Sequence, residues 1–543
     1  MTAGRATPIN PRKVGLWVGL IAIAVLATTG WWRVPAGLAG RVVARFTGAG
    51  KVTRGGLVVV RLSGSPSTIR LQQALLLGPE RAALDRAVRQ ARLAWPDDGR
   101  TPALNLIQPG LAARGGSAFA ASRPATGDGP PVAAANLDSA ALSVGGGPAP
   151  VVYLVSETGK IPYAGVGFPG LEHLQVGVNR AGVAAIHVPA DRDPIGDPPS
   201  TAIAAILAEA RTVEEATAVL REVAHLAPAE VILADSTGQA VVVDLVGGEA
   251  RVRQASSGLA LAAGVPPARE WARAPAGSSA LSRLQRLTEL TALGYGSLDR
   301  GRAVAILRDR FDTDARRNDP CGDVIASEAT IISAVIEPGA PRLWVAGRAP
   351  GSTSASVAVP ASFGAFIPFE PPGGRASRAP QASRPGPPAP IPAAPAPADT
   401  YAKGQAAFDE AQAARRDLIG GRYAAAIAHY QRALAIAETA PQPKPATFDP
   451  ANVAPPGLGR LRLRLADARG LQAAPSAEAY REALAAGLSR DDRAYARAAL
   501  GVILELSGAV KEAAVEYQAA LAERTGLEAV EGPVRRGLAR LGQ

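Results

Sequence analysis

A run of prolines divides this chain of 543 residues into parts that must fold separately. Residues 371–397 read PPGGRASRAPQASRPGPPAPIPAAPAP. Proline fixes φ and lacks a backbone N–H, so such a run forms neither a helix nor the interior of a sheet, and an extended, semi-rigid spacer is expected. The run predicts a linker over residues 366–399, with a folded domain over 55–365 before it and another over 400–543 after it.

Length and composition narrow the class of protein. The chain is too long for a single core, and its apolar content of 47% excludes wholesale disorder. The net charge of +11 suggests nucleic acid as a partner, but the arginines are scattered and aromatic residues make up only 4%, so nucleic-acid binding is not expected. One cysteine and four histidines, without ligand spacing, favour neither a disulfide nor a metal site, and no cofactor is expected.

The N-terminal region predicts a membrane anchor. After a tail over residues 1–13, residues 14–32 read VGLWVGLIAIAVLATTGWW without a charge. Nineteen helical residues span roughly 30 Å of hydrocarbon, and the final tryptophans suit the membrane interface. We expect a single uncleaved transmembrane helix in a bacterial inner membrane, with the bulk of the chain outside the cytoplasm. A cleavable signal peptide is the alternative, although small-residue cleavage sites here are poor.

The stretch from Gly115 to Asp138 carries the chemical signal. It reads GGSAFAASRPATGDGPPVAAANLD, which predicts a bend at small residues, an apolar strand, a Gly/Pro hairpin and a second strand with Asn136 near its end. A hydroxyl or thiol attacks an amide only when a base takes its proton and fixed donors stabilise the oxyanion. A nucleophile at the start of a mature chain uses its own α-amine as that base, so self-cleavage must come first.

This stretch resembles the N-terminal-nucleophile (Ntn) hydrolases of the penicillin acyltransferase family, which are autoproteolytic cysteine peptidases. The resemblance rests on Phe-Ala-Ala at 119–121, Pro-Ala-Thr at 124–126 and Asn-Leu-Asp at 136–138. It places the family's catalytic cysteine on Gly116, and the chain's own Cys321 is remote in sequence. The neighbouring hydroxyl belongs to Ser117, and a shift of one residue along a strand turns the side chain to the other face.

Two further polar positions of the family differ in this chain. The family's strand after residues 210–228 opens with an oxyanion-hole asparagine, and the matching residue is Glu230, whose charge would repel a developing oxyanion. The family's Thr-Asn-His falls on Ala263, Gly264 and Val265. The core pattern persists in residues 165–189, including an Asn-x-x-Gly turn, and in the hairpin over 330–350. The resemblance implies an α+β fold, an αββα sandwich of two antiparallel sheets between helices, with one helix over 202–226.

Three functions remain open for this domain. It is a catalytically degenerate ligand or partner module, or an active amidohydrolase or acyltransferase that uses Ser117 as terminal nucleophile. In the active case Asn136 and Asp138 would orient the amine, and small amides or acyl thioesters are the substrates that the resemblance implies. The third possibility is an assembly or secretion factor in which the sandwich is only structural.

Beyond residue 400 the apolar pattern becomes helical and repetitive. Residues 420–438 place Tyr430 and Ala433 at the spacing of the second helix of a tetratricopeptide repeat, and Tyr517 with Ala520 repeats that spacing. A weaker copy surrounds Tyr480. We expect about three degenerate repeats, an all-α solenoid that binds a protein partner; an ordinary helical bundle is the alternative.

Overall fold

The computed structural model describes most of the chain from residue 49 onward, and the account below is confined to that part. The described residues are 49–93, 116–138, 150–189, 200–222, 229–246, 249–264, 279–312, 317–318, 324–327, 330–346, 361–373, 389–393, 402–419, 421–440, 457–473, 475–488, 490–523 and 528–543. The predicted anchor at residues 14–32 lies outside them, as do Cys321 and Val265. No helix in the described part is long and apolar enough to cross a membrane.

The larger sheet has nine strands and all its neighbours are antiparallel except one pair. β2 and β5 run parallel, which departs from the two fully antiparallel sheets that the family resemblance implies. Most of the inner strands are rich in valine and alanine and are buried on both faces, as expected where both sides of a sheet are covered. The strands, in spatial order, are β1 (Gly50–Arg54), β2 (Leu57–Gly64), β5 (Val151–Glu157), β6 (Tyr163–Gly167), β7 (Leu174–Asn179), β8 (Ala184–Pro189), β9 (Ala229–Ala234), β10 (Ala240–Val246) and β11 (Glu249–Gln254).

The smaller sheet carries the stretch that resembles the cut site. Its six strands are all antiparallel to their neighbours, and the hairpin predicted over 330–350 forms its β15–β16 pair. A separate two-stranded ladder joins β13 (Phe311–Asp312) to β14 (Arg317–Asn318). The six strands, in spatial order, are β12 (Leu259–Ala262), β3 (Gly116–Ala121), β4 (Val132–Asp138), β15 (Thr330–Glu337), β16 (Arg342–Ala346) and β17 (Phe366–Phe369).

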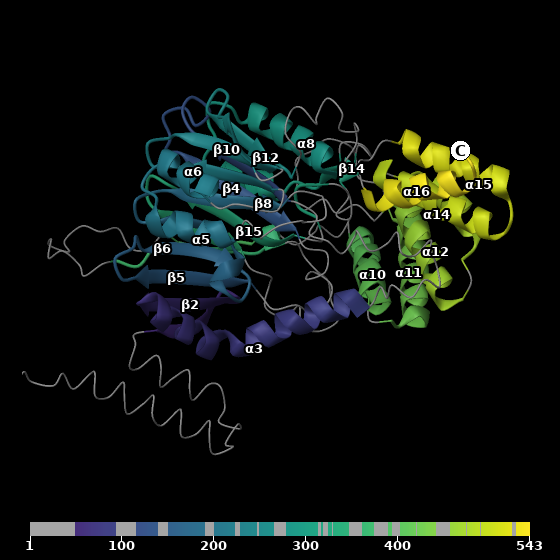
Figure 1. The fold of residues 1–543 in the computed structure, drawn as a ribbon, viewed down its shortest axis with the longest axis horizontal. Coiled ribbons are helices and arrows are strands. Elements are labelled where there is room, and N and C mark those ends of the chain that lie inside the picture. The colour runs from purple at the N-terminus through teal and green to yellow at the C-terminus, as the bar shows by residue number, and fades with distance from the viewer. Residues whose placement is uncertain are drawn as a thin grey trace, which may run out of the picture.

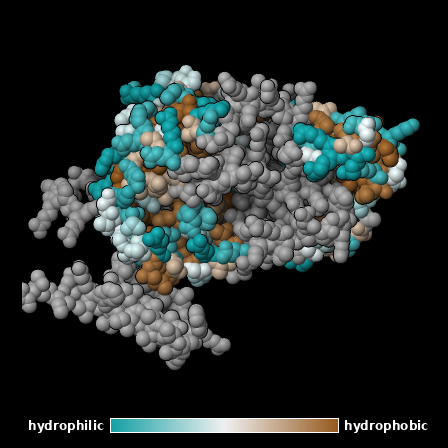
Figure 2. Space-filling view, in the orientation of Figure 1, coloured by the Kyte–Doolittle hydropathy of each residue, from teal (hydrophilic) through white to brown (hydrophobic). Residues whose placement is uncertain are grey.

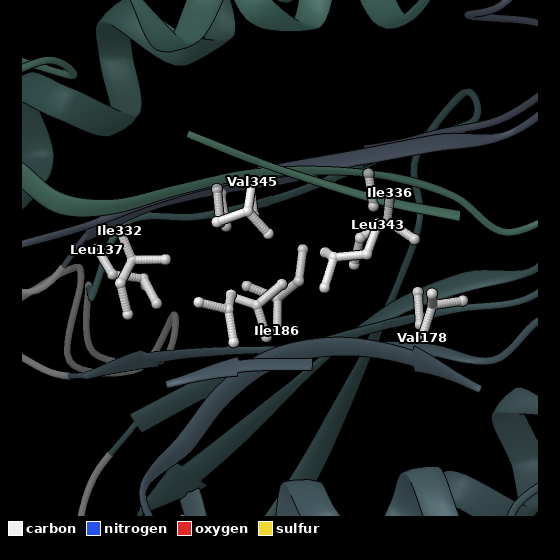
Figure 3. Packing of buried hydrophobic residues seen from close by; sticks show 14 of the residues in the cluster. Leu137, Val178, Ile186, Ile332, Ile336, Leu343 and Val345 are labelled. Atoms are coloured by element: carbon white, nitrogen blue, oxygen red, sulfur yellow. The ribbon is translucent and has the colours of Figure 1, made fainter. Parts of the chain in front are cut away.

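The two sheets pack face to face with helices on their outer faces (Figure 1). An apolar core between them takes side chains from both sheets, among them Leu137, Ile186 and Val345 (Figure 3). A second core joins the nine-stranded sheet to α3, α5 and α6, and a third joins the six-stranded sheet to α8 and α9. The predicted mixed α+β fold is therefore present. These helices are α3 (Pro66–Leu93), α5 (Ser200–Glu209), α6 (Val213–Glu222), α8 (Ser279–Leu293) and α9 (Arg300–Leu307).

The helix predicted over residues 202–226 is two helices, because side chains from two strand turns satisfy the backbone at the break. Asn179 opens the predicted Asn-x-x-Gly turn, and its amide donates to the carbonyls of Leu207 (3.1 Å) and Ala210 (2.6 Å) at the end of α5. Asp235, in the turn after β9, accepts a hydrogen bond from the backbone N–H of Val213 at the start of α6. Buried helix ends need such partners, so the two turns determine where α5 stops and α6 begins.

The sheet domain extends into the segment assigned to the linker. β17 pairs with β16, so residues 366–369 belong to the six-stranded sheet. Within the proline-rich run, Ile391 forms an antiparallel bridge with Phe366. The predicted boundary at 366 missed these contacts because FIPF is a short, mostly apolar strand just before the proline-rich run at 371–397.

The C-terminal part is all helical, as predicted, and its helices lie in a group of their own (Figure 1). Consecutive helices pack against one another, and the short α10–α11 and α14–α15 connections each contain a glycine with positive φ, Gly421 and Gly508. In the view of Figure 2 these helices present mainly hydrophilic side chains, with smaller hydrophobic patches. They are α10 (Ala402–Ile419), α11 (Tyr423–Thr439), α12 (Leu458–Gln472), α13 (Ala477–Ala485), α14 (Arg490–Leu506), α15 (Val510–Ala522) and α16 (Glu528–Arg540).

A buried tyrosine followed three residues later by a buried alanine recurs in four of these helices. The pairs are Tyr430 and Ala433 in α11, Tyr480 and Ala483 in α13, Tyr495 and Ala498 in α14, and Tyr517 and Ala520 in α15. The small alanine lets the neighbouring helix approach, and the tyrosine fills the space beside it. The recurrence is the physical basis of the periodicity seen in the sequence.

Candidate active site

Gly116, the position that matches the family's cysteine, begins β3 and faces the space between the two sheets. It shares this face with Ala118, which lies in the inter-sheet core. A Cβ at Gly116 would clash with the backbone oxygen of Asn136 and would lie 3.1 Å from Leu137 Cδ2. The backbone of β4 therefore approaches β3 so closely that position 116 has no room for a side chain without a shift of the strand.

Ser117 lies on the opposite face of β3, toward α8 and α9, with Phe119. It is 1% exposed, and its Oγ has no hydrogen-bond partner in the described structure. Its strand partner is Asn136, and the bond between residues 116 and 117 lies inside the paired strand. The hydroxyl and the peptide bond that it would have to expose are thus both buried.

Asn136 is fully buried, and both N–H donors of its side-chain amide are used in holding the fold together. Its Nδ2 donates to the carbonyl oxygens of Leu307, at the end of α9, and Ile325, at 2.7 and 2.9 Å. Its Oδ1 accepts a hydrogen bond from the Ser333 hydroxyl on β15 at 2.6 Å. Asn136 therefore connects β4, β15 and α9, and its side-chain amide is engaged in these structural contacts rather than held free beside a chain terminus.

Asp138 stands two residues further along β4, on the same face as Asn136. It is 5% exposed, and its Oδ1 accepts a hydrogen bond from the Thr330 hydroxyl at 2.7 Å. The three predicted residues thus share one outer face of the six-stranded sheet. Position 116 shares the other face, so the structure separates the family's nucleophile position from the side chains that were expected to serve it.

Glu230 connects the two sheets at the position where the family has its oxyanion asparagine. Its side chain, on β9, is 3% exposed and lies on the face toward the six-stranded sheet. Its Oε2 accepts hydrogen bonds from the backbone N–H groups of Ala263 (3.0 Å) and Gly264 (2.6 Å), which follow β12. Two adjacent N–H donors aimed at one oxygen are the arrangement that stabilises an oxyanion. Here a carboxylate of the protein itself occupies them.

Arg253 and Asp244 complete this cluster, and the sequence analysis did not identify either. The guanidinium of Arg253, on β11, binds Glu230 Oε1 and both carboxylate oxygens of Asp244, at 2.7 and 2.9 Å for the latter. Burial lowers the pKa of Arg253, but hydrogen bonds and charges from Asp244 and Glu230 outweigh it and hold that pKa above its ordinary value. A charged residue in the apolar run VVVDLV followed by the alternation of ARVRQ was the available signal.

The described residues at this site offer binding groups but no nucleophile that faces the space between the sheets. Position 116 has no side chain, Ser117 faces outward, and the N–H pair after β12 already holds a carboxylate. No group of histidine, cysteine, aspartate and glutamate in the described part could hold a metal ion.

These features define a class of protein domain, an Ntn-hydrolase-like sandwich. Residues 152–351 match the model of the family described as acyl-coenzyme A:6-aminopenicillanic acid acyl-transferase. The chain therefore contains an acyltransferase-like domain of this class. The matched residues begin after β4, so they include Glu230 and Gly264 but not Gly116 or Asn136.

Two solved structures are similar to part of the chain. Penicillin V acylase from Agrobacterium tumefaciens is 15% identical, with 43% of this chain and 83% of that chain covered and a TM-score of 0.29. A variant of conjugated bile acid hydrolase from Clostridium perfringens is 11% identical, with 43% and 82% covered and a TM-score of 0.25. A search of curated proteins found no match.

Proposed function

We propose that this protein is a membrane-anchored scaffold whose acyltransferase-like domain has lost catalysis and serves as a ligand or partner module. A helix over residues 14–32 holds it in the membrane, with the bulk of the chain outside the cytoplasm. The helices after residue 400 act as degenerate tetratricopeptide-like repeats that recruit another protein. The ligand of the sandwich is a small amide or acyl compound, in keeping with the class of its domain.

The observation that carries the loss of catalysis is the pairing of Glu230 with the N–H groups of Ala263 and Gly264. Acyl transfer needs donors that are free to bind the oxyanion as it forms. A buried carboxylate on these donors supplies a permanent negative charge, beside the guanidinium that Arg253 shares between Glu230 and Asp244. The pair is satisfied before any substrate arrives, so it contributes no stabilisation to a transition state.

The surroundings of position 116 support the same conclusion from a different strand. An attacking group needs a side chain or a free amine beside the substrate, and Gly116 provides no side chain. Loss of the cysteine removes the need for processing. The close approach of β4 to Gly116 is the packing expected of a strand that is never cut.

An active enzyme that uses Ser117 is the second candidate, and one observation favours it. The Ser117 hydroxyl is buried without a hydrogen-bond partner in the described structure, which is costly unless a role or a water molecule compensates. Its outward direction and its place inside a paired strand oppose this role.

Hydrolysis assays on the purified full-length chain separate the two candidates. Small amides and acyl thioesters would be offered to the wild type, to Ser117→Ala and to a chain heated to unfold it. We expect all three to give the same background rate. A rate above background that disappears in Ser117→Ala would establish the second candidate. Recruitment is tested separately by co-purification with the full chain and with a chain that ends at residue 399.

A further inference from the structure

A short piece of the proline-rich run is bound to the sheet domain. The backbone of Ile391 exchanges two hydrogen bonds with Phe366, N–H to carbonyl in each direction, both at 3.0 Å. β17 is the last strand of the six-stranded sheet, so Ile391 occupies an edge that would otherwise lack a backbone partner. The residues on either side of Ile391 are prolines, and Ile391 is therefore the one residue of Pro-Ile-Pro that can form both bonds.

Arg308 holds the same segment from the side. It follows α9, and its Nη2 donates to the carbonyl oxygen of Pro392 at 2.8 Å. The same guanidinium donates to the carbonyls of Ser362 (2.8 Å) and Gly364 (3.3 Å), in the turn that leads into β17. One arginine thus connects α9, the approach to β17 and the proline-rich segment.

Apolar packing adds a third contact. The side chain of Ile391 is half-buried and packs against the core between the six-stranded sheet and its helices, to which Phe366 and the fully buried Trp344 belong. The neighbouring residues Ala389, Pro390, Pro392 and Ala393 are exposed. Ile391 is thus the residue that anchors the segment.

We propose that residues 389–393 form a strap that fastens the proline-rich linker to the edge of β17 and so limits the distance between the sheet domain and the helical domain. Between the strap and the start of α10 there remain residues 394–401. Eight residues span at most about 29 Å, whereas residues 370–401, without the strap, could span roughly 100 Å as an extended proline-rich spacer. The strap therefore shortens the tether several-fold. This inference does not depend on the presence or absence of catalysis.

Distance measurements on the full chain test the strap. Cys321→Ser removes the native thiol, and spin labels at Ala340→Cys and Val515→Cys, both exposed, report on the two domains. Ile391→Asp should release the strap, since it places a charge against apolar side chains, and the distance distribution should broaden and lengthen by on the order of 10 Å or more. Ala389→Asp, which adds the same charge at an exposed position, should leave the distribution as in the parent.

Hydrogen exchange supplies a second readout that does not need labels. The amide of Ile391 should exchange at least about tenfold more slowly than the amides of Ala389 and Ala393, and Arg308→Ala should reduce that protection. An Ile391 amide that exchanges as fast as its neighbours would overturn the proposal. So would a distance distribution that is unchanged by Ile391→Asp.

Discussion

The Glu230 carboxylate on β9 accepts a 2.6 Å hydrogen bond from the backbone N–H of Gly264, just after β12, and this bond joins the two sheets of the sandwich. The bond connects Glu230 and Gly264, two positions at which the family resemblance implies catalytic groups that this chain lacks. The residue at the first position now occupies the backbone donors at the second. A glutamate here thus differs from the asparagine that the resemblance implies by more than a missing donor, because it adds an internal anion.

Removing that anion should strongly destabilise the sheet domain. Glu230→Ala leaves the N–H groups of Ala263 and Gly264 buried without a partner and removes one of the two carboxylates on Arg253, so we expect a loss of about 3–5 kcal/mol in the free energy of unfolding. Urea denaturation measures it. Glu249→Ala is the matched control, because its ion pair with Arg251 is exposed on both sides, and it should cost less than about 1 kcal/mol. Equal costs for the two variants would refute the structural role of Glu230.

A cysteine at position 116, where the resemblance implies one, should not give the protein amide-hydrolysing activity. In Gly116→Cys the new Cβ collides with the backbone of β4, so we expect a loss of about 1–3 kcal/mol in stability and no hydrolysis of amides. Ser117→Cys places the same thiol on the other face, where a Cβ is already accommodated, and should cost less. Thermal denaturation and an amide-hydrolysis assay measure both effects. A Gly116→Cys protein that is as stable as the wild type and cuts itself would contradict this prediction.

In the helical domain, replacing a buried glycine with alanine should lower stability, although alanine has the higher helix propensity. Tyr517 lies between Gly501 of α14 and Gly537 of α16, where an added Cβ would be 2.7 and 2.5 Å from its ring. A glycine-to-alanine change ordinarily stabilises a helix by about 1 kcal/mol. For Gly501→Ala we expect instead a net loss of roughly 1–3 kcal/mol in the free energy of unfolding. In a Tyr517→Leu background the loss should shrink, and a double-mutant cycle by chemical denaturation measures the coupling. Additive effects would show that the ring does not oppose the Cβ.

A buried histidine should make stability depend on pH. His187, on β8, is 6% exposed and its Nδ1 lies 2.7 Å from Gln175 Oε1; burial lowers its pKa to about 4. Between pH 6.5 and 4 the unfolded chain therefore binds a proton that the folded chain does not. Stability falls as the pH drops through this window, by up to about 3 kcal/mol from this group alone.

A histidine variant isolates this effect from other groups. His187→Gln should flatten the loss of stability between pH 6.5 and 4, measured by denaturation at each pH, whereas His173→Gln, at a less buried histidine, should follow the wild type. If His187→Gln and the wild type lose stability in parallel, the burial of an uncharged His187 is not the cause.

Much of the fold follows from local pattern, whereas the site required long-range contacts. The strands around Phe119 and Asn136 were predicted because short apolar runs between turn residues indicate strands locally. That positions 116 and 117 face opposite sides of the sheet follows from the two-residue period of a strand. The partners of Asn136, the carbonyls of Leu307 and Ile325, are more than 170 residues away in the chain, and no local pattern indicates them.

Two further differences have the same physical origin. The single helix expected over 202–226 breaks because the side chains of Asn179 and Asp235 satisfy helix ends that lie elsewhere in the sequence. The linker was predicted to be an extended spacer, but Ile391 within it pairs with the edge strand β17 of the sheet domain. In both cases a tertiary contact determines the local structure, and local sequence propensity does not indicate that contact.

Intact-mass analysis of the purified full-length protein tests the proposed loss of catalysis most directly, since a sandwich domain without a terminal nucleophile would not cut itself. The account predicts a single polypeptide in which one peptide spans residues 115–118 after digestion. Two fragments, with Gly116 or Ser117 at a new N-terminus, and turnover of an amide or thioester by the cut form would contradict it.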